Sequence, residues 1–326
     1  MLSNTGKIVK NTDQSKIKLD QQIKRVLACK PILSRILKEV VEECKPYSPE
    51  EVENFIEGDV QISQEFVNPG HPEVIHGQSE EDYVNGEGMV RYDIRTYLMI
   101  PGQTRQNIKI LIDVEAQKDD APGYSIPLRG LFYCCRMISS QLETEFTNSQ
   151  SDSVKYGNLK KVYSIWICTE TAQCRANTIE KYSIGKDFLY GYNQDEHRYD
   201  LMSTIIINIS KTYNTDGCDN ELICMLTNLF NKDMDADDKI RTLEQDYGIP
   251  MTAEIKEGVD SMCTYTEAVE QRGIEKGIKE GYDQAIFSLV QRGTISVEQG
   301  AQELKTDTDT FVRMMEEAGY KAPASV

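Results

Sequence analysis

Two neighbouring stretches of the chain alternate between apolar and polar residues over the length of a β-strand. They are Met89–Ile100 and Asn107–Gln117, and the short polar segment PGQTRQ connects them. Successive side chains of a strand point to opposite faces, so Ile112, Val114 and Ala116 share an apolar face. Two such segments with a turn-rich connection predict an antiparallel hairpin.

Helical spacing of apolar residues precedes the hairpin. Ser34–Cys44 has this spacing, with Ser34 as its expected N-cap, and a second short helix begins at Ser48 and Pro49 and ends before Gly58. The first 20 residues are polar, and we expect them to be frayed. The stretch after Gly58 is rich in turn residues and acids and predicts a loop.

The chain after the hairpin predicts further helices and strands. We expect a helix over Pro127–Phe146, with Leu131, Cys135, Ile138 and Leu142 forming its apolar stripe. The β-prone segment KKVYSIWIC (Lys160–Cys168) predicts a central strand. Further strands are expected at IEKYSIG and Ser203–Ser210, and further helices at Asn220–Phe230, Ala236–Tyr247 and Thr252–Arg272. This order indicates an α/β fold with a mixed central sheet flanked by helices and a helical C-terminal extension.

The residue pattern of the sequence changes after Gln271. Glycine and isoleucine or tyrosine recur every four residues in RGIEKGIKEGY, close to one helical turn. This repeat indicates either a weak spacer helix, because interior glycine disfavours a helix, or a close-packing seam for self-association. We divide the chain into a polar segment (1–30), a main domain (31–232), a helical extension (233–272) and the repeat with a small helical tail (273–326).

Charge and composition narrow the class of protein. The net charge is −17, but it is uneven: residues 1–45 are basic, and residues 46–90 hold eleven acids and no Lys or Arg. Net acidity argues against nonspecific coating of DNA, although a local site remains open. No apolar run is long enough to span a membrane, and nine cysteines without a CxxC pair indicate reduced thiols of a cytoplasmic protein.

The polar face of the second hairpin strand carries the candidate chemistry. Asp113, Glu115 and Gln117 alternate with apolar residues, and the preceding strand has an isolated acid, Asp93. A solvent-facing strand would explain alternation alone. The hairpin, however, lays Asp93 beside Glu115, and the next helix carries Arg129 four residues before Tyr133, on one helical face.

The ordered set of EGMVRYDIRTYL, IDVEAQ, LRGLFYCCRMISSQ and KKVYSIWIC resembles the recombination-promoting nuclease family of the PD-(D/E)XK nuclease superfamily. The resemblance covers about residues 30–290. Members of this family are described as transposases, but this chain shows no DDE-type arrangement. The resemblance implies a restriction-endonuclease-like core of α-β-β-β-α-β type, with the site on the central hairpin.

Site residues follow from the resemblance by position. It implies Asp93 and Glu115 as metal-binding acids, with Glu43 of the first helix, or Glu42 in its place, completing the site. Gln117 stands where most of the superfamily has lysine, and Lys118 points to the opposite face. The role of Asp113 is left open between a solvated or paired acid and a member of the site. Arg129 is either a phosphate clamp or a partner of a nearby acid, and Tyr133 is expected to pack.

These residues predict a Mg²⁺-dependent DNA endonuclease, with Mn²⁺ as an alternative metal, tied to recombination or a mobile element. Mg²⁺ prefers oxygen ligands and assists phosphodiester hydrolysis. Gln117 is neutral and cannot act as a general base, so we expect modest activity that rises with pH. DNA contacts are expected from the basic residues 1–45 and from Lys160 and Lys161, while the acidic 46–90 stretch would either repel DNA or mimic it. The alternatives are a non-catalytic nuclease-fold binding or assembly protein, and an RNA or nucleotide phosphodiesterase.

Overall fold

The structure is a computed structural model, and it describes residues 4–58, 61–62, 81–84, 88–101, 108–118, 121–141, 156–192, 199–215 and 217–321. The chain divides into two compact units. The larger is Ile17–Thr264, and the smaller combines Met1–Lys16 with Tyr265–Val326. The larger unit thus takes in the end of the segment that we expected to be polar and separate, and most of the helical extension.

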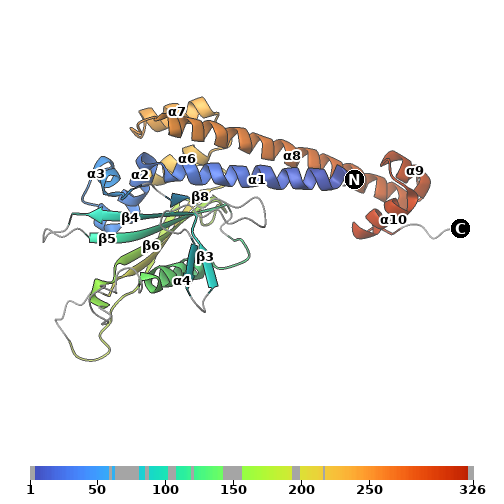
Figure 1. The fold of residues 1–326 in the computed structure, drawn as a ribbon. Coiled ribbons are helices and arrows are strands. Elements are labelled where there is room, and N and C mark those ends of the chain that lie inside the picture. The colour runs from blue at the N-terminus through green and yellow to red at the C-terminus, as the bar shows by residue number, and fades with distance from the viewer. Residues whose placement is uncertain are drawn as a thin grey trace. The chain divides into compact units, whose positions relative to one another are not determined.

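A six-stranded mixed sheet forms the centre of the larger unit, in the order β1-β4-β5-β6-β8-β7 (Figure 1). β4 pairs antiparallel with β5, β5, β6 and β8 run parallel, and β7 returns antiparallel to β8. A separate pair joins β2 (Glu81–Val84) to β3 (Gly88–Arg91). The predicted α/β fold and the hairpin are therefore confirmed, while the PGQTRQ connection lies largely outside the described residues. The strands of the main sheet are β1 (Gln61–Ile62), β4 (Ile94–Ile100), β5 (Ile108–Gln117), β6 (Lys161–Thr171), β7 (Thr178–Ser183) and β8 (Met202–Ser210).

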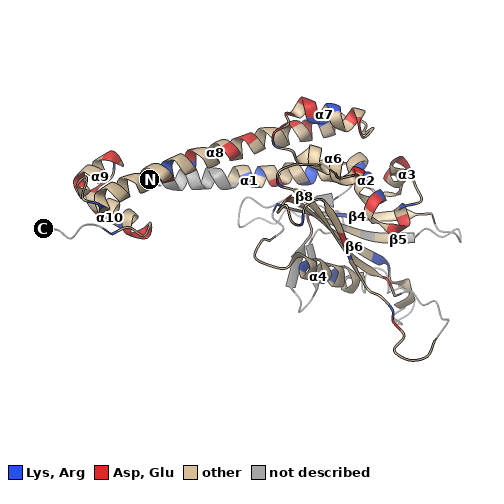
Figure 2. Ribbon diagram, turned by 180° about the vertical axis from the view of Figure 1, so that it is seen from behind, with Lys and Arg blue, Asp and Glu red and all other residues tan. Residues whose placement is uncertain are grey.

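Helices cover both faces of this sheet (Figures 1 and 2). One face is covered by α1 (Asn4–Ala28), α2 (Lys30–Val40), η1 (Glu42–Cys44), α3 (Pro49–Phe55) and α6 (Glu221–Phe230). α7 (Ala236–Gln245) and the first part of α8 (Ala253–Gln291) add side chains to the same hydrophobic core. The opposite face packs against α4 (Ile126–Ser139). A short turn, η2 (Tyr156–Asn158), precedes β6.

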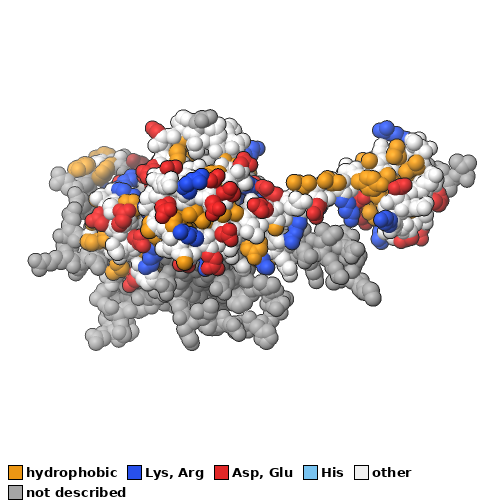
Figure 3. All heavy atoms as spheres, turned by 90° about the horizontal axis from the view of Figure 1, so that it is seen from above, with side chains coloured by type: hydrophobic (Ala, Val, Ile, Leu, Met, Phe, Trp, Pro, Cys, Tyr) orange, Lys and Arg blue, Asp and Glu red, His pale blue; other side chains and the backbone are white. Residues whose placement is uncertain are grey.

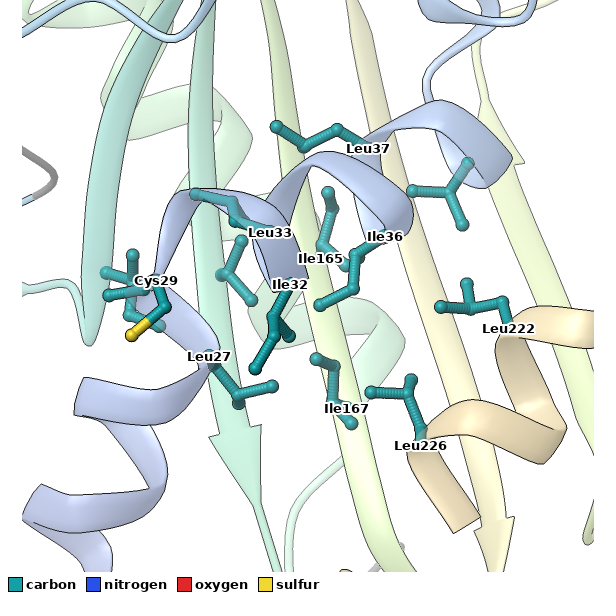
Figure 4. Packing of buried hydrophobic residues seen from close by; sticks show 14 of the residues in the cluster. Leu27, Cys29, Ile32, Leu33, Ile36, Leu37, Ile165, Ile167, Leu222 and Leu226 are labelled. Carbon is teal, nitrogen blue, oxygen red and sulfur yellow. The ribbon is translucent and has the colours of Figure 1, made fainter. Parts of the chain in front are cut away.

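The alternation of β6 explains the two cores. Tyr163, Ile165 and Ile167 are buried toward α2, and Trp166 and Cys168 are buried toward α4. Figure 4 shows the larger core, in which residues of α2 point toward the strands. Because both faces of β6 are covered, nearly every residue of this strand is buried, as predicted for a central parallel strand.

The helix predictions need three corrections. The first 20 residues are not frayed as a whole, because α1 begins at Asn4 and buries Val26 and Leu27 in the core. Ser34 is not an N-cap: the helix begins at Lys30, and Ser34 is buried inside it. The long helix does not end at Arg272, because α8 continues through the glycine repeat to Gln291.

The stripe predicted on the helix after the hairpin is wrong at two of its four positions; Ile138 packs against the core as predicted, and Leu142 lies outside the described residues. Leu131 and Cys135 are exposed, whereas Tyr133, Cys134 and Met137 are buried against the sheet. The apolar pattern of LRGLFYCC allows more than one face, and the glycine decides between them. Gly130 faces the sheet so closely that an added Cβ would lie 2.3 Å from Thr204 Cγ2.

The smaller unit contains the second part of α8 with α9 (Val297–Glu303) and α10 (Thr308–Glu317). A small core of Phe287, Val290, Phe311 and Met315 holds these three helices together. The repeat residues Ile274, Ile278 and Tyr282 are exposed, and Gly277 has open space where a side chain would be. Both interpretations of the repeat, spacer and self-association seam, therefore remain predictions. None of the helices in the described part of the chain is long and apolar enough to cross a lipid bilayer.

The cysteines allow a chemical test of these burial patterns. All nine are free thiols; Cys135 and Cys174 are exposed, and Cys44 is buried. Burial, with the charge of Glu43, raises the pKa of Cys44 to about 12. At pH 8 iodoacetamide should therefore alkylate Cys135 and Cys174 and spare Cys44, as measured by peptide mass mapping. Labelling of Cys44 at the rate of Cys135 would contradict the fold, and labelling in urea controls for intrinsic reactivity.

Gly130→Ala tests the close approach of α4 to the sheet. The new methyl group would overlap Thr204 and the Trp166 ring, so we expect a loss of about 1–3 kcal/mol in the free energy of unfolding. Urea unfolding followed by the fluorescence of Trp166, the single tryptophan, measures it. The control is Gly277→Ala, which meets open space and therefore should not lower the stability that Trp166 reports. Equal stability of wild type and Gly130→Ala would show that α4 does not lie against β8 as described.

Candidate functional site

The register of the hairpin brings Asp93 and Glu115 together. Ile94 pairs with Val114. Asp93, which precedes Ile94, therefore lies beside Glu115, which follows Val114. The backbone N–H of Asp93 donates to Glu115 Oε1 at 3.0 Å, and the backbone N–H of Ala116 donates to Asp93 Oδ2 at 3.1 Å. Each carboxylate is thus anchored on the backbone of the other's strand, as the sequence predicted for their proximity.

An irregularity of the chain precedes β4 and sets the position of Asp93. The predicted strand Met89–Ile100 is interrupted, because β3 ends at Arg91 and β4 begins at Ile94. Tyr92 turns into the core under α4, where its ring meets that of Tyr133 edge-on with centroids 5.3 Å apart. Asp93 therefore lies between two buried side chains, Tyr92 on the α4 side of the sheet and Ile94 on the α2 side.

A lysine from α1 approaches the acid pair. Lys24 Nζ lies 2.8 Å from Asp93 Oδ1 and 2.6 Å from Asp20 Oδ2, one helical turn away on α1. The Lys24 side chain is only 8% exposed. Such a buried ammonium requires carboxylate partners, because an uncompensated buried charge is strongly unfavourable.

Burial and charge act in opposite directions on this pair. Burial raises the pKa of Asp93, while the nearby Lys24 ammonium and the Ala116 N–H lower it without cancelling the rise. Burial alone would lower the pKa of Lys24, but the carboxylates of Asp93 and Asp20 outweigh it and raise that pKa. Lys24 therefore stays positively charged at neutral pH and acts as the counter-ion of the site.

Gln117 lies on the same face of β5 as Glu115 and belongs to a hydrogen-bond chain. The Tyr124 hydroxyl donates to Gln117 Oε1 at 3.1 Å, and Arg129 in turn donates to the Tyr124 hydroxyl. With its oxygen bound in this way, the Gln117 side chain presents its N–H₂ group as the remaining donor. The site thus receives a hydrogen-bond donor at Gln117.

Arg129 sits among aromatic rings. Its guanidinium lies 4.9 Å from the ring centroid of Tyr124, 5.2 Å from that of Tyr133 and 5.3 Å from that of Trp166. It also donates to the Tyr133 hydroxyl at 2.7 Å. Among the described residues no carboxylate forms an ion pair with Arg129, so the predicted pairing with an acid is not seen there. Tyr133 packs in the core as predicted.

Glu43 is not brought to the acid pair, which corrects the predicted ligand set. Its Oε1 binds Lys161 Nζ at 2.9 Å, and its Oε2 accepts from the Tyr163 hydroxyl at 2.8 Å. Lys161 pairs with Ile110, five residues before Glu115 on β5, or about 16 Å along the strand. Glu42 is not a substitute, because it is exposed and pairs with Lys45.

The other predicted residues fall outside the acid pair. Lys118 Nζ lies 3.6 Å from Glu170 Oε2, so Lys118 pairs with an acid outside the Asp93–Glu115 pair. Lys161 is buried between Glu43 and Asp200 and is not free for a DNA backbone, contrary to expectation. The side chain of Asp113 and most of the acidic 46–90 stretch lie outside the described residues.

Two site residues were missed from the sequence. Asp20 and Lys24 belong to a segment that contains Leu19, Ile23, Val26 and Leu27, which is helical apolar spacing. An i, i+4 acid–lysine pair on that helix was visible in DQQIK. The polarity of the preceding residues hid the apolar face of α1.

The acid pair fits a hard divalent cation. Mg²⁺ binds to one or two carboxylates together with waters and substrate phosphate, and Asp93 and Glu115 supply these oxygens. Asp93 Oδ1 already holds one cation, the Lys24 ammonium. Within the described residues no group of three or more His, Cys, Asp or Glu side chains is arranged around a metal position. A divalent cation at this position would thus have Asp93 and Glu115 as its candidate ligands.

Comparisons with known protein families, with curated proteins and with solved structures found no match.

Glu43→Gln tests the separation of Glu43 from the acid pair. The variant loses a charged partner of Lys161, so we expect the free energy of unfolding to fall by about 1–3 kcal/mol, with Mn²⁺ affinity unchanged. Urea unfolding and a Mn²⁺ titration measure the two quantities. The exposed Glu42→Gln is the control and should change stability by less than about 0.5 kcal/mol. Loss of Mn²⁺ binding by folded Glu43→Gln would restore Glu43 as a ligand.

Proposed function

We propose that the chain is a metal-dependent DNA endonuclease that hydrolyses phosphodiester bonds, with Mg²⁺ as its cofactor or Mn²⁺ in its place. One observation supports this above the others: Asp93 and Glu115 are held side by side on a β-hairpin by reciprocal backbone hydrogen bonds. Two neighbouring, largely buried acids are unfavourable without a cation between or beside them. Lys24 supplies one such cation to Asp93, and we propose that a divalent metal supplies the other.

Each residue of the site has a role in this proposal. Asp93 and Glu115 hold the metal, which would polarise the phosphodiester and lower the pKa of a water. Gln117 donates a hydrogen bond to a phosphate oxygen or to the attacking water, and Tyr124 fixes its orientation. Arg129 donates a hydrogen bond to the Tyr124 hydroxyl and places a positive charge close to Glu115.

The absence of proton-accepting capacity in Gln117 sets the expected pH dependence. Its amide cannot take a proton from water, so the proton must leave to solvent and the rate should rise with pH. DNA is the proposed partner, in recombination or in the transfer of a mobile element. The cytoplasm is the proposed location, which is consistent with nine free thiols.

DNA would have to bind at a local surface of the protein. The described face in Figure 3 carries more acidic than basic side chains, and Figure 2 shows acids on α3 and α7.

A second candidate has a specific observation in its favour. Lys24 already satisfies Asp93 Oδ1, and a stable ion pair of this kind is also what a nuclease fold without catalysis would keep. Under this alternative the chain is a non-catalytic binding or assembly protein, and its C-terminal helices contact partners or a second copy. The two candidates differ in whether the acid pair binds a divalent metal.

Cleavage of plasmid DNA in Mg²⁺ tests the proposal. Wild type should nick or linearise the plasmid, and Asp93→Asn and Glu115→Gln should lower the rate at least about 100-fold, because each removes several kcal/mol of transition-state stabilisation. Gel electrophoresis measures the products, and EDTA should stop the reaction.

The matched control is Glu43→Gln, which removes a carboxylate from a comparable buried ion pair away from the site. It should cleave like wild type. Equal cleavage by wild type, Asp93→Asn and Glu115→Gln would rule out the assignment and indicate a contaminating nuclease. A single-stranded RNA competitor that abolishes cleavage would shift the substrate to RNA.

A further inference from the structure

The Lys24 ammonium occupies the side of Asp93 that a metal would need. Asp93 Oδ2 accepts the Ala116 N–H, while Oδ1 faces Lys24 Nζ at 2.8 Å. Glu115 Oε1 is likewise engaged by the Asp93 N–H. The other oxygen of Asp93, Oδ1, is therefore bound by a cation that belongs to the chain itself.

A divalent ion at Asp93 Oδ1 would come close to this ammonium. Two positive charges at neighbouring positions repel each other, and the repulsion is large where water is largely excluded. The Lys24 side chain is 8% exposed, and that of Asp93 is 19% exposed, so solvent screens them little. The ammonium and the metal therefore exclude each other from Asp93 Oδ1.

Asp20 offers the ammonium a place to remain when it leaves Asp93. Its Oδ2 lies 2.6 Å from Lys24 Nζ, and its side chain is 40% exposed. The i, i+4 spacing on α1 keeps the two residues on one face of the helix whatever Asp93 binds. Lys24 can thus turn from a bridge between two carboxylates to a partner of Asp20 alone without losing all compensation.

We propose that Lys24 is a built-in competitor for the divalent cation, which holds the cation position of Asp93 until a metal displaces it onto Asp20. This inference rests on the proposed metal site and deepens it, because it assigns Lys24 to the control of metal affinity. Lys24 is a positioning residue in this scheme, and it lowers the affinity of the acid pair for metal. The site is consequently filled only when the metal, or the metal together with a phosphate, outcompetes the ammonium.

A second buried lysine provides a matched control. Lys161 is also 8% exposed at its side chain and also bridges two carboxylates, those of Glu43 and Asp200. It differs in its place, because it contacts neither Asp93 nor Glu115. Replacing Lys161 removes an equivalent charge and an equivalent ion pair, and it leaves the acid pair intact.

The test is a Mn²⁺ titration of the full chain, followed by isothermal calorimetry and by the EPR signal of free Mn²⁺. Lys24→Met should bind Mn²⁺ at one site about tenfold more tightly than wild type, since it removes a neighbouring positive charge. Lys161→Met should not change the affinity of that site. Equal or weaker binding by Lys24→Met, or equal tightening by Lys161→Met, would overturn the proposal.

Asp20→Asn keeps the proposal testable if Lys24→Met does not fold, as circular dichroism would show. This variant keeps Lys24 on Asp93 and removes the acceptor of the displaced ammonium, so Mn²⁺ should bind more weakly than to wild type. Unchanged or tighter binding would count against the displacement.

DNA cleavage by the same proteins separates this inference from the proposed function. Cleavage by wild type without tighter Mn²⁺ binding by Lys24→Met would leave the nuclease standing and remove the competition. Tighter binding without cleavage by any of the proteins would leave the competition standing and remove the nuclease. If wild type, Lys24→Met and Asp20→Asn all fail to bind Mn²⁺, the inference is overturned.

Discussion

The pairing register of β4 against β5 is the constraint on which the site depends. Ile110, Ile112 and Val114 of β5 must face the core under α2, and Ile94 opposite Val114 must do the same. A slip of one residue would turn these side chains to the other face and expose them, which is strongly unfavourable. The positions of Asp93 and Glu115 are therefore a consequence of where the hydrophobic residues go. Hydrophobic burial brings the two carboxylates close together, although they do not attract each other.

Charge compensation completes this arrangement from a distant part of the chain. Lys24 reaches Asp93 because α1 packs on the sheet through Val26 and Leu27, so hydrophobic contacts carry the lysine to its place. On the other side of the sheet, Arg129 is held by Tyr124, Tyr133 and Trp166. The acid pair thus has the Lys24 ammonium beside it and the Arg129 guanidinium, surrounded by aromatic rings, nearby. The proposed exchange with a metal concerns Lys24 alone.

Predictions from local patterns were confirmed where a sequence pattern is compatible with a single local structure. The short helix predicted to begin at Ser48 and Pro49 forms, and its start is closed by a capping box of Ser48 and Glu51, whose two bonds join residues only three apart. The strand Lys161–Thr171 is central, because its residues 162–169 are rich in β-branched and aromatic side chains and carry no charge, which suits burial on both faces. Predictions failed where several solutions were compatible with the pattern. In α4 two apolar faces were available, and contact with Thr204 and Trp166 selected the face with Gly130.

The sequence by itself determined the mixed sheet, the hairpin and the closeness of Asp93 and Glu115, because alternation and turn residues act over a few neighbours. Tertiary structure alone decided the partners of the charged groups. Glu43 joined Lys161, and Lys24 joined Asp93 across 69 positions of the chain, since each buried charge takes the nearest opposite charge that packing supplies. Packing depends on contacts between segments that are remote in sequence, and no local pattern encodes them.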